Sequence, residues 1–182
     1  MLHLAYGPMG TGIMVTSNAD KLDTIIEGGT GTSSMLLCHP EEMPKKLESG
    51  TPNTIGISGL KAGVDFVRKT GIKNIFNHEM DLINYAYDGL KNIKNVELYV
   101  PRPDRKYFVP VLSFNVKGYI SDEIGKILNE KNIAVRTGLH CSPVAHKYFS
   151  TIDKGTVRIS PSIFTKKIEI NKFLKVISSV RN

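Results

Sequence analysis

The first 71 residues of this chain differ in pattern from the rest, and that contrast limits what the chain can fold into. Three glycine-rich loops fall within them, at residues 7–12, 28–34 and 48–53. One clear helical pattern follows, with apolar residues at three- and four-residue steps from Ile57 to Val67, and Gly71 ends it. This is too little regular structure for a separate core, so we expect residues 1–71 to be the end of a larger domain. Two short elements are expected between the loops, a strand at residues 13–15 and a helix at residues 40–47.

From residue 72 onward the pattern is regular. Helices are expected around residues 82–93, from Ser121 onward and around residues 170–177. Strands are expected at residues 96–100, 112–116, 133–135 and 156–160. Residues 72–182 therefore form a second domain of α+β type, with two or three helices against a small, mostly antiparallel sheet. The fold class is α/β overall.

Composition narrows the function classes. The net charge of +7 comes from scattered lysines, with no aromatic-interleaved basic stripe and no nucleic-acid-binding motif. No apolar run approaches the roughly 20 residues of a membrane helix. We therefore expect no nucleic acid and no membrane as partners, and a cytoplasmic protein. The two cysteines, Cys38 and Cys141, are far apart in sequence and are expected to be free thiols.

Cys141 is the strongest candidate for chemistry. Gly138 precedes it and Pro143 follows it, which indicates an exposed loop that can move, as a nucleophile requires. Arg136 and His140 are close enough in sequence to favour the reactive thiolate. Burial as a structural cysteine is the alternative, and the polar flanks argue against it.

Other candidates are weaker on the residues alone. His140, Cys141 and His146 could be ligands of a soft metal, but their spacing matches no established site, so no metal is expected. Cys38 lies in an apolar run and is expected to be packed. His78 is expected to cap or flank its helix.

Arg158 alternates with apolar neighbours on its expected strand. It is either a solvated arginine or a planar fork that grips a substrate carboxylate through two hydrogen bonds. The loops that contain Gly28 and Thr51 offer backbone N–H groups to an anion such as phosphate, and the second loop leads into a helix. Tight structural turns are the alternative for both loops.

Five motifs together resemble the class V aminotransferase superfamily, most closely its cysteine desulfurases of the Suf-like group and the related selenocysteine lyases. In chain order they read GPMGTG (residues 7–12), EGGTG (27–31), ESGTPN (48–53), RTGLHC (136–141) and GTVRIS (155–160). The resemblance covers nearly the whole chain. It implies the carboxyl-terminal part of the aspartate aminotransferase-type fold of pyridoxal phosphate enzymes (fold type I). Residues 1–71 would end the large cofactor domain, and residues 72–182 would form the small domain.

The resemblance also implies roles for single residues. In the family reaction, pyridoxal phosphate acts as an electron sink, a protein cysteine attacks the sulfur of L-cysteine or selenium of selenocysteine, and alanine leaves. Cys141 would be that nucleophile, and the persulfide it carries would pass to an acceptor protein. Arg158 would hold the substrate carboxylate, with Arg136 and His140 at the wall of the site. Gly28 and Thr51 would approach the cofactor phosphate of a neighbouring subunit, which implies a homodimer.

One departure from the family pattern bears on activity. The family lysine that forms the Schiff base with the cofactor lies a few residues before the GPMGTG motif, where this chain has the sequence MLHLA. The first lysine here is Lys21. We therefore expect a truncated cysteine desulfurase that is inactive alone. Two alternatives remain open: a non-catalytic module that dimerises or carries a persulfide, and another class V relative such as an aminotransferase or epimerase.

Overall fold

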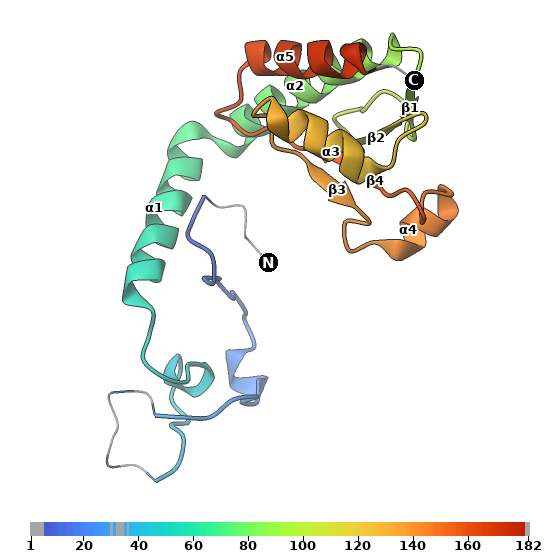
Figure 1. The fold of residues 1–182 in the computed structure, drawn as a ribbon. Coiled ribbons are helices and arrows are strands. Elements are labelled where there is room, and N and C mark those ends of the chain that lie inside the picture. Colours follow the sequence, from blue (N-terminus) through green and yellow to red (C-terminus); the bar gives the residue numbers. More distant parts are fainter. Residues whose placement is uncertain (1–5, 30, 32–34, 36, 181–182) are drawn as a thin grey trace. The chain divides into compact units, whose positions relative to one another are not determined.

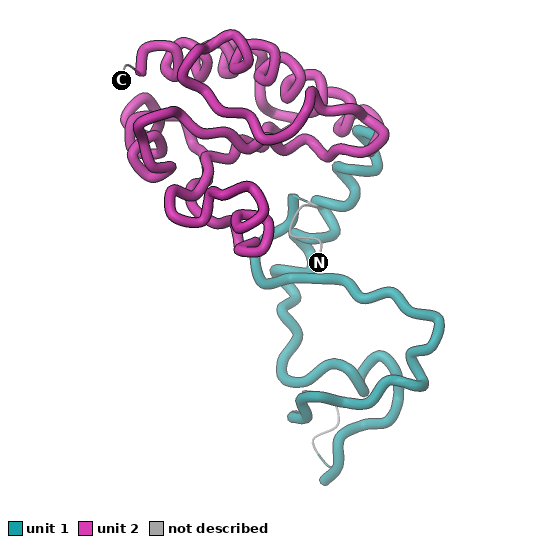
Figure 2. The backbone as a smooth tube through the Cα atoms, turned by 90° about the vertical axis from the view of Figure 1, so that its right-hand side faces the viewer, with its two compact units in different colours: residues 1–71 teal, residues 72–182 magenta. Residues whose placement is uncertain are grey.

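The computed structural model describes residues 6–29, 31, 35 and 37–180. The chain divides into two compact units, Met1–Gly71 and Ile72–Asn182, coloured separately in Figure 2. The assignment of the first unit to a large cofactor domain stays a prediction.

One long helix, α1 (Thr54–Thr70), organises the first unit. Asn53 begins it, because its side chain accepts a hydrogen bond from the Gly56 backbone N–H at 3.0 Å. Gly71 ends it with a φ of +86°, a conformation that glycine adopts without strain. The helix that the apolar spacing predicted is confirmed.

The glycine motif at residues 7–12 packs along α1. A side chain at Gly7 would lie 2.9 Å from Leu60, and one at Gly59 would lie 2.9 Å from Pro8. Both distances are below van der Waals contact, so close approach of loop and helix requires glycine at both positions. This part of the motif therefore has a packing role.

Two of the glycine-rich loops meet in the first unit. The Gly50 N–H donates to the Gly29 carbonyl at 3.0 Å, so the loop with Gly28 lies against the loop with Thr51. The predicted strand at residues 13–15 is wrong, since these residues are irregular and exposed. The predicted helix at residues 40–47 is reduced to one 3-10 turn, η2 (Lys45–Leu47), and a second turn, η1 (Ala19–Lys21), was not foreseen.

The second unit is a four-stranded antiparallel sheet with helices, shown in Figure 1. Its elements in chain order are α2 (Ile72–Lys91), β1 (Val96–Leu98), β2 (Leu112–Val116), α3 (Ser121–Glu130), β3 (Arg136–Gly138), α4 (Pro143–Tyr148), β4 (Thr156–Ile159) and α5 (Lys167–Ser179). The strand order is β1-β2-β4-β3, so β4, the last in sequence, lies between β2 and β3. This inserted strand brings Arg158 beside the loop that follows β3.

The core of this unit lies where α2, α3 and α5 pack on the sheet. Phe114 of β2 meets Phe173 of α5 edge to face, with ring centroids 5.6 Å apart. Val157, Ile83 and Leu90 are also fully buried. The strand predicted at residues 112–116 is confirmed, and its alternate residues Leu112, Phe114 and Val116 are buried.

Several details differ from the sequence predictions. The helix predicted around residues 82–93 is α2, which begins earlier, at Ile72, and the strand predicted at residues 96–100 ends at Leu98. The strand predicted at residues 133–135 starts later, as β3 from Arg136. Asn115 of β2 is 1% exposed, and its side-chain amide donates to the Gly155 carbonyl at 2.8 Å. His78 lies inside α2 rather than at its end, and its Nε2 bonds the Thr165 carbonyl at 2.9 Å.

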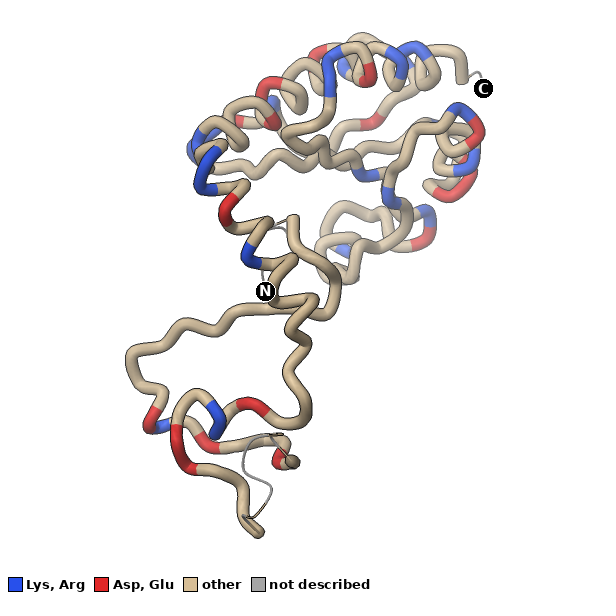
Figure 3. Tube along the Cα trace, turned by 90° about the vertical axis from the view of Figure 1, so that its left-hand side faces the viewer, with Lys and Arg blue, Asp and Glu red and all other residues tan. Residues whose placement is uncertain are grey.

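Charged residues of both signs are interspersed along the second unit, as Figure 3 shows. The described ion pairs, such as Arg102 with Asp88 at 2.8 Å, lie on the surface. No helix in the described ranges is long and apolar enough to cross a membrane.

Candidate functional site

The site begins with two arginines on neighbouring strands. In the antiparallel pairing of β3 with β4, Arg136 lies directly opposite Arg158. Like charges in such a cross-strand position repel, so each needs a partner of its own. Arg136 has one in Cys141, whereas the Nε of Arg158 is buried and has no hydrogen-bond partner among the described residues.

Two glycines set the point at which the chain leaves β3. Gly155, with a φ of +61°, has so little room that an added Cβ would lie 2.6 Å from Ser121 Oγ and 2.8 Å from the Gly138 Cα. The Gly138 N–H in turn donates to Ser121 Oγ at 3.2 Å. The first residue of α3, the end of β3 and the start of β4 are thus held together directly before the cysteine loop.

Cys141 lies on a tightly turned, exposed loop. His140 and Cys141 have φ values of +52° and +60°, in the left-handed region that non-glycine residues seldom occupy. The thiol is exposed, and Arg136 Nη2 donates a hydrogen bond to its sulfur at 3.4 Å. A reachable sulfur beside a cation is the arrangement of a nucleophilic or sulfur-carrying cysteine.

The other cysteine is also exposed. Cys38, predicted to be packed, is a free and accessible thiol, and that prediction is wrong. A short apolar sequence run does not bury a residue when the segment makes no core. Within the described residues no group of three or more His, Cys, Asp or Glu side chains is placed to hold a metal ion.

A pocket of about 330 Å³ adjoins the cysteine loop. Its walls are mainly apolar and aromatic, and its polar lining includes His140, Arg158, Thr156, His146 and Ser142. Arg158 and His140, which line this pocket, each have a buried side-chain nitrogen without a hydrogen-bond partner among the described residues, Nε and Nδ1 respectively. Buried nitrogens of this kind are usually satisfied by a bound group or water. The pocket therefore suits a small ligand with an anionic end.

The surroundings of His140 favour its neutral form. Burial lowers the pKa of the imidazole below the ordinary value of 6.5, and electrostatic interactions with Arg158, His146 and Arg136 lower it further. A backbone contact with Thr156 opposes the shift. The Nε2 atom is 2.9 Å from Thr156 Oγ1. A neutral imidazole beside two arginines avoids a third positive charge at the site.

Lys154 is paired with a carboxylate and does not line the pocket. It donates to Glu97 at 2.8 Å, and this hydrogen bond raises the pKa of Lys154 and lowers that of Glu97. Tyr99, which lines the pocket, shares the same carboxylate at 3.3 Å. No lysine is among the described residues that line the pocket.

Four of the six predicted site residues come together in the second unit: Arg136, His140, Cys141 and Arg158. Arg136 contacts the thiol and is not part of the pocket lining. Gly28 and Thr51 lie in the first unit, on the two loops joined through Gly50. Sequence reasoning did not identify Thr156 or Ser121, and it considered His146 only as a metal ligand. The available signal for Thr156 was its place two residues before Arg158, on the same face of the strand.

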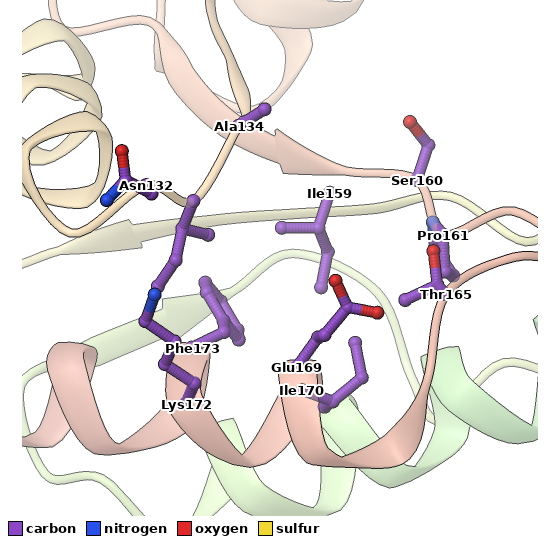
Figure 4. A pocket seen from close by; sticks show the side chains of 11 residues that line it. Asn132, Ala134, Ile159, Ser160, Pro161, Thr165, Glu169, Ile170, Lys172 and Phe173 are labelled. Carbon is purple, nitrogen blue, oxygen red and sulfur yellow. The ribbon is translucent and has the colours of Figure 1, made fainter.

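A second, larger cavity of about 370 Å³ lies elsewhere in the second unit (Figure 4). Ile159 projects into it from β4, and Ile170 and Phe173 project from α5. None of the predicted site residues lines it. Because this cavity is lined neither by the neighbours of Cys141 nor by a residue with a buried unpartnered polar atom, we place the candidate site at the smaller pocket.

Comparison with known proteins decides the family. The family described as "Aminotransferase class-V" matches residues 2–173. The chain belongs to the class V aminotransferases. A cysteine desulfurase of Wigglesworthia glossinidia brevipalpis is 32% identical over 98% of this chain and 43% of its own length. A probable cysteine desulfurase of Pyrococcus abyssi is 33% identical over 96% of this chain and 43% of its own length.

Solved structures agree with the fold. The apo structure of a cysteine desulfurase from Thermococcus onnurineus NA1 has a TM-score of 0.69 and 34% identity, over 74% of this chain and 33% of that one. The predicted fold class, mixed α/β of fold type I, is confirmed. This class V chain spans about 43% of the length of the curated relatives it matches.

Proposed function

We propose that this chain carries the sulfur-accepting half of a cysteine desulfurase site, in which L-cysteine yields L-alanine and a persulfide on Cys141. The observation that carries the proposal is the arrangement of one exposed thiol bonded by Arg136 at 3.4 Å beside a pocket with a buried, unpartnered Arg158 Nε. Relatives that are cysteine desulfurases support it.

The residues present suit two steps of the reaction, binding of the substrate carboxylate and attack on the substrate sulfur. Arg158 binds the substrate carboxylate, since a guanidinium donates two parallel hydrogen bonds to such a group. Cys141 attacks the substrate sulfur, so that an S–S bond forms as the C–S bond breaks. Arg136 stabilises the anionic sulfur before and after that step. The persulfide then passes to an acceptor protein.

Pyridoxal phosphate, when bound, supplies the electron sink that this chemistry needs. The pocket does not fit its covalent attachment, because no described lining residue is a lysine and Lys154 is held by Glu97. The loops of Gly28 and Thr51 fit the weaker role of phosphate contacts across a homodimer. We therefore expect no alanine from L-cysteine with this chain alone, even with added cofactor.

We place the protein in the cytoplasm, since both described cysteines are free thiols. A second candidate function is a persulfide carrier that is loaded by another protein. The exposed thiol together with the missing pocket lysine favours it. Both functions require that Cys141 accept sulfur, and the first also requires that Arg158 hold the carboxylate of the donor.

Sulfur loading tests this shared requirement. The chain is treated with L-cysteine persulfide, and each cysteine is then analysed by mass spectrometry for one added sulfur. We expect loading at Cys141 and little at Cys38, the control, which is also an exposed free thiol. Arg158→Gln is expected to reduce loading from L-cysteine persulfide but not from inorganic polysulfide, which has no carboxylate.

Equal loading of the two cysteines from L-cysteine persulfide would contradict the proposal. Loading from L-cysteine persulfide that is unchanged in Arg158→Gln would contradict it too. The chain alone could also form sulfide and alanine from L-cysteine, in a reaction that Cys141→Ala abolishes. That result would overturn the expectation that the chain cannot attach the cofactor through a pocket lysine.

A further inference from the structure

The larger cavity of the second unit lies where β3 and β4 cease to pair. Their antiparallel pairing ends at Arg136 opposite Arg158, and three residues further on the same register would place Ile133 opposite Pro161. Proline has a fixed φ and no backbone N–H to donate, so Pro161 cannot continue the ladder. The two chain segments line a cavity of about 370 Å³ there instead, with α5 on its other side (Figure 4).

This cavity has an apolar floor and a charged rim. The floor consists of Ile159, Ile170 and Phe173, core residues that are no more than 8% exposed. The rim includes Glu169 and Lys172 of α5, which are exposed. A ligand in the cavity can therefore reach both charges while its apolar part displaces water from the floor.

The two rim charges have opposite sign, and they are not paired with each other. Lys172 follows Glu169 by three residues, and Figure 4 shows both side chains rising from α5 toward the cavity. Opposite charges at this spacing commonly form an ion pair. Among the described residues neither side chain belongs to one. Glu169 Oε2 accepts a hydrogen bond from the Lys166 backbone N–H at 2.7 Å, which leaves Oε1 available.

We propose that this cavity is a binding site for an α-amino acid with an apolar side chain. Glu169 accepts from the ammonium group of the ligand, Lys172 donates to its carboxylate, and the ligand side chain lies on the apolar floor. The Cβ atoms of residues three apart on a helix are about 5–6 Å apart, so the two side chains can close on two groups that share one carbon atom. A ligand with one charge would leave an unmatched charge of its own sign beside it on the rim.

This second site goes beyond the proposed function. Neither Cys141 nor Arg158 lines the cavity, and no covalent chemistry is assigned to it. The ligand is recognised by its two charges and its apolar side chain, so a thiol is not required.

Titration with L-leucine, followed by NMR of the backbone amides, tests the site. We expect saturable shifts at Ile133 and Ile170, which line the cavity. Glycine has the same two charges without the side chain, and it should bind at least about tenfold more weakly because it buries little apolar surface. 4-Methylpentanoate lacks the ammonium group of leucine and 3-methylbutylamine lacks its carboxylate. Each should bind at least about threefold more weakly than leucine, the effect of one exposed ion pair.

Variants of α5 assign the two charged contacts. Lys172→Met keeps the aliphatic stem and should weaken leucine about threefold or more, without weakening 3-methylbutylamine. Glu169→Gln can still accept from the Lys166 N–H, and it should weaken leucine by a similar factor without weakening 4-methylpentanoate. Lys175→Met is the matched control, because Lys175 is exposed on the same helix but does not line the cavity. Its affinity for leucine should equal that of the wild-type chain.

Three results would overturn the inference. The first is the absence of saturable leucine shifts at the lining residues. The second is an equal loss of affinity in Lys172→Met and Lys175→Met, which would indicate an effect of net charge alone. The third is a singly charged analogue that binds as tightly as leucine, which would show that the site does not recognise an amino acid. Loading of Cys141 by L-cysteine persulfide is a separate measurement, so failure of the proposed function would be distinguished from failure of this site.

Discussion

The packing of Gly155 offers the sharpest test of how the fold positions the cysteine loop. Gly155→Ala adds one methyl group at a φ of +61°, where an L residue costs about 1–2 kcal/mol. The new Cβ would lie 2.6 Å from Ser121 Oγ and 2.8 and 3.1 Å from backbone atoms of Gly138. Backbone atoms of a paired strand move little, so overpacking adds about 1–3 kcal/mol. The expected loss of unfolding free energy is about 2–5 kcal/mol.

Gly138→Ala is the matched control. Gly138 also has a positive φ, of +94°, but no atom lies within 4 Å of its added Cβ. Gly138→Ala should therefore lower the free energy of unfolding only by the cost of the positive φ, about 1–2 kcal/mol. Both substitutions reduce the freedom of the unfolded chain equally, so the difference between them isolates the contact with Ser121 and Gly138.

Urea denaturation followed by far-UV circular dichroism measures both free energies. The chain has no tryptophan, so backbone ellipticity is the suitable signal. Typical domains are stable by about 5–15 kcal/mol, which makes the expected loss readily visible. Equal losses in the two variants would refute the reasoning, because they would show that the β4 start and the β3 end are not held in this close contact.

Three further predictions concern the site and the sheet that supports it. Arg136→Gln should slow alkylation of Cys141 by iodoacetamide several-fold while Arg136→Lys slows it less, and equal rates in all three chains would contradict a role of the guanidinium at the sulfur. Asn115→Ala should cost about 1–3 kcal/mol in urea denaturation, because it leaves a buried carbonyl without its donor, and a neutral result would disprove that hydrogen bond. The lowered pKa of His140 means that below pH 6.5 the unfolded chain binds more protons, so stability should fall as pH falls from 6.5 toward the folded pKa. His140→Gln should flatten this part of the stability curve, and an unchanged slope would count against the shift.

The sequence by itself determined most of the second unit. Apolar spacing predicted α2, α3, β2, β4 and α5, because burial of one face imposes a period of 3.6 on a helix and of 2 on a strand. The five motifs in order predicted the family, and the polar flanks of Cys141 predicted its exposure. These features are local, so they can be read along the chain.

The tertiary structure alone decided the rest. Insertion of β4 between β2 and β3 placed Arg158 opposite Arg136, and no local pattern encodes which strands pair. Asn115 is satisfied by the Gly155 carbonyl, which lies 40 residues away in sequence. Cys38 looked buried because apolar neighbours in sequence were taken for neighbours in space. The contact of Thr156 with the His140 ring could not be predicted either, since a hydrogen bond across 16 residues depends on the fold that closes the distance.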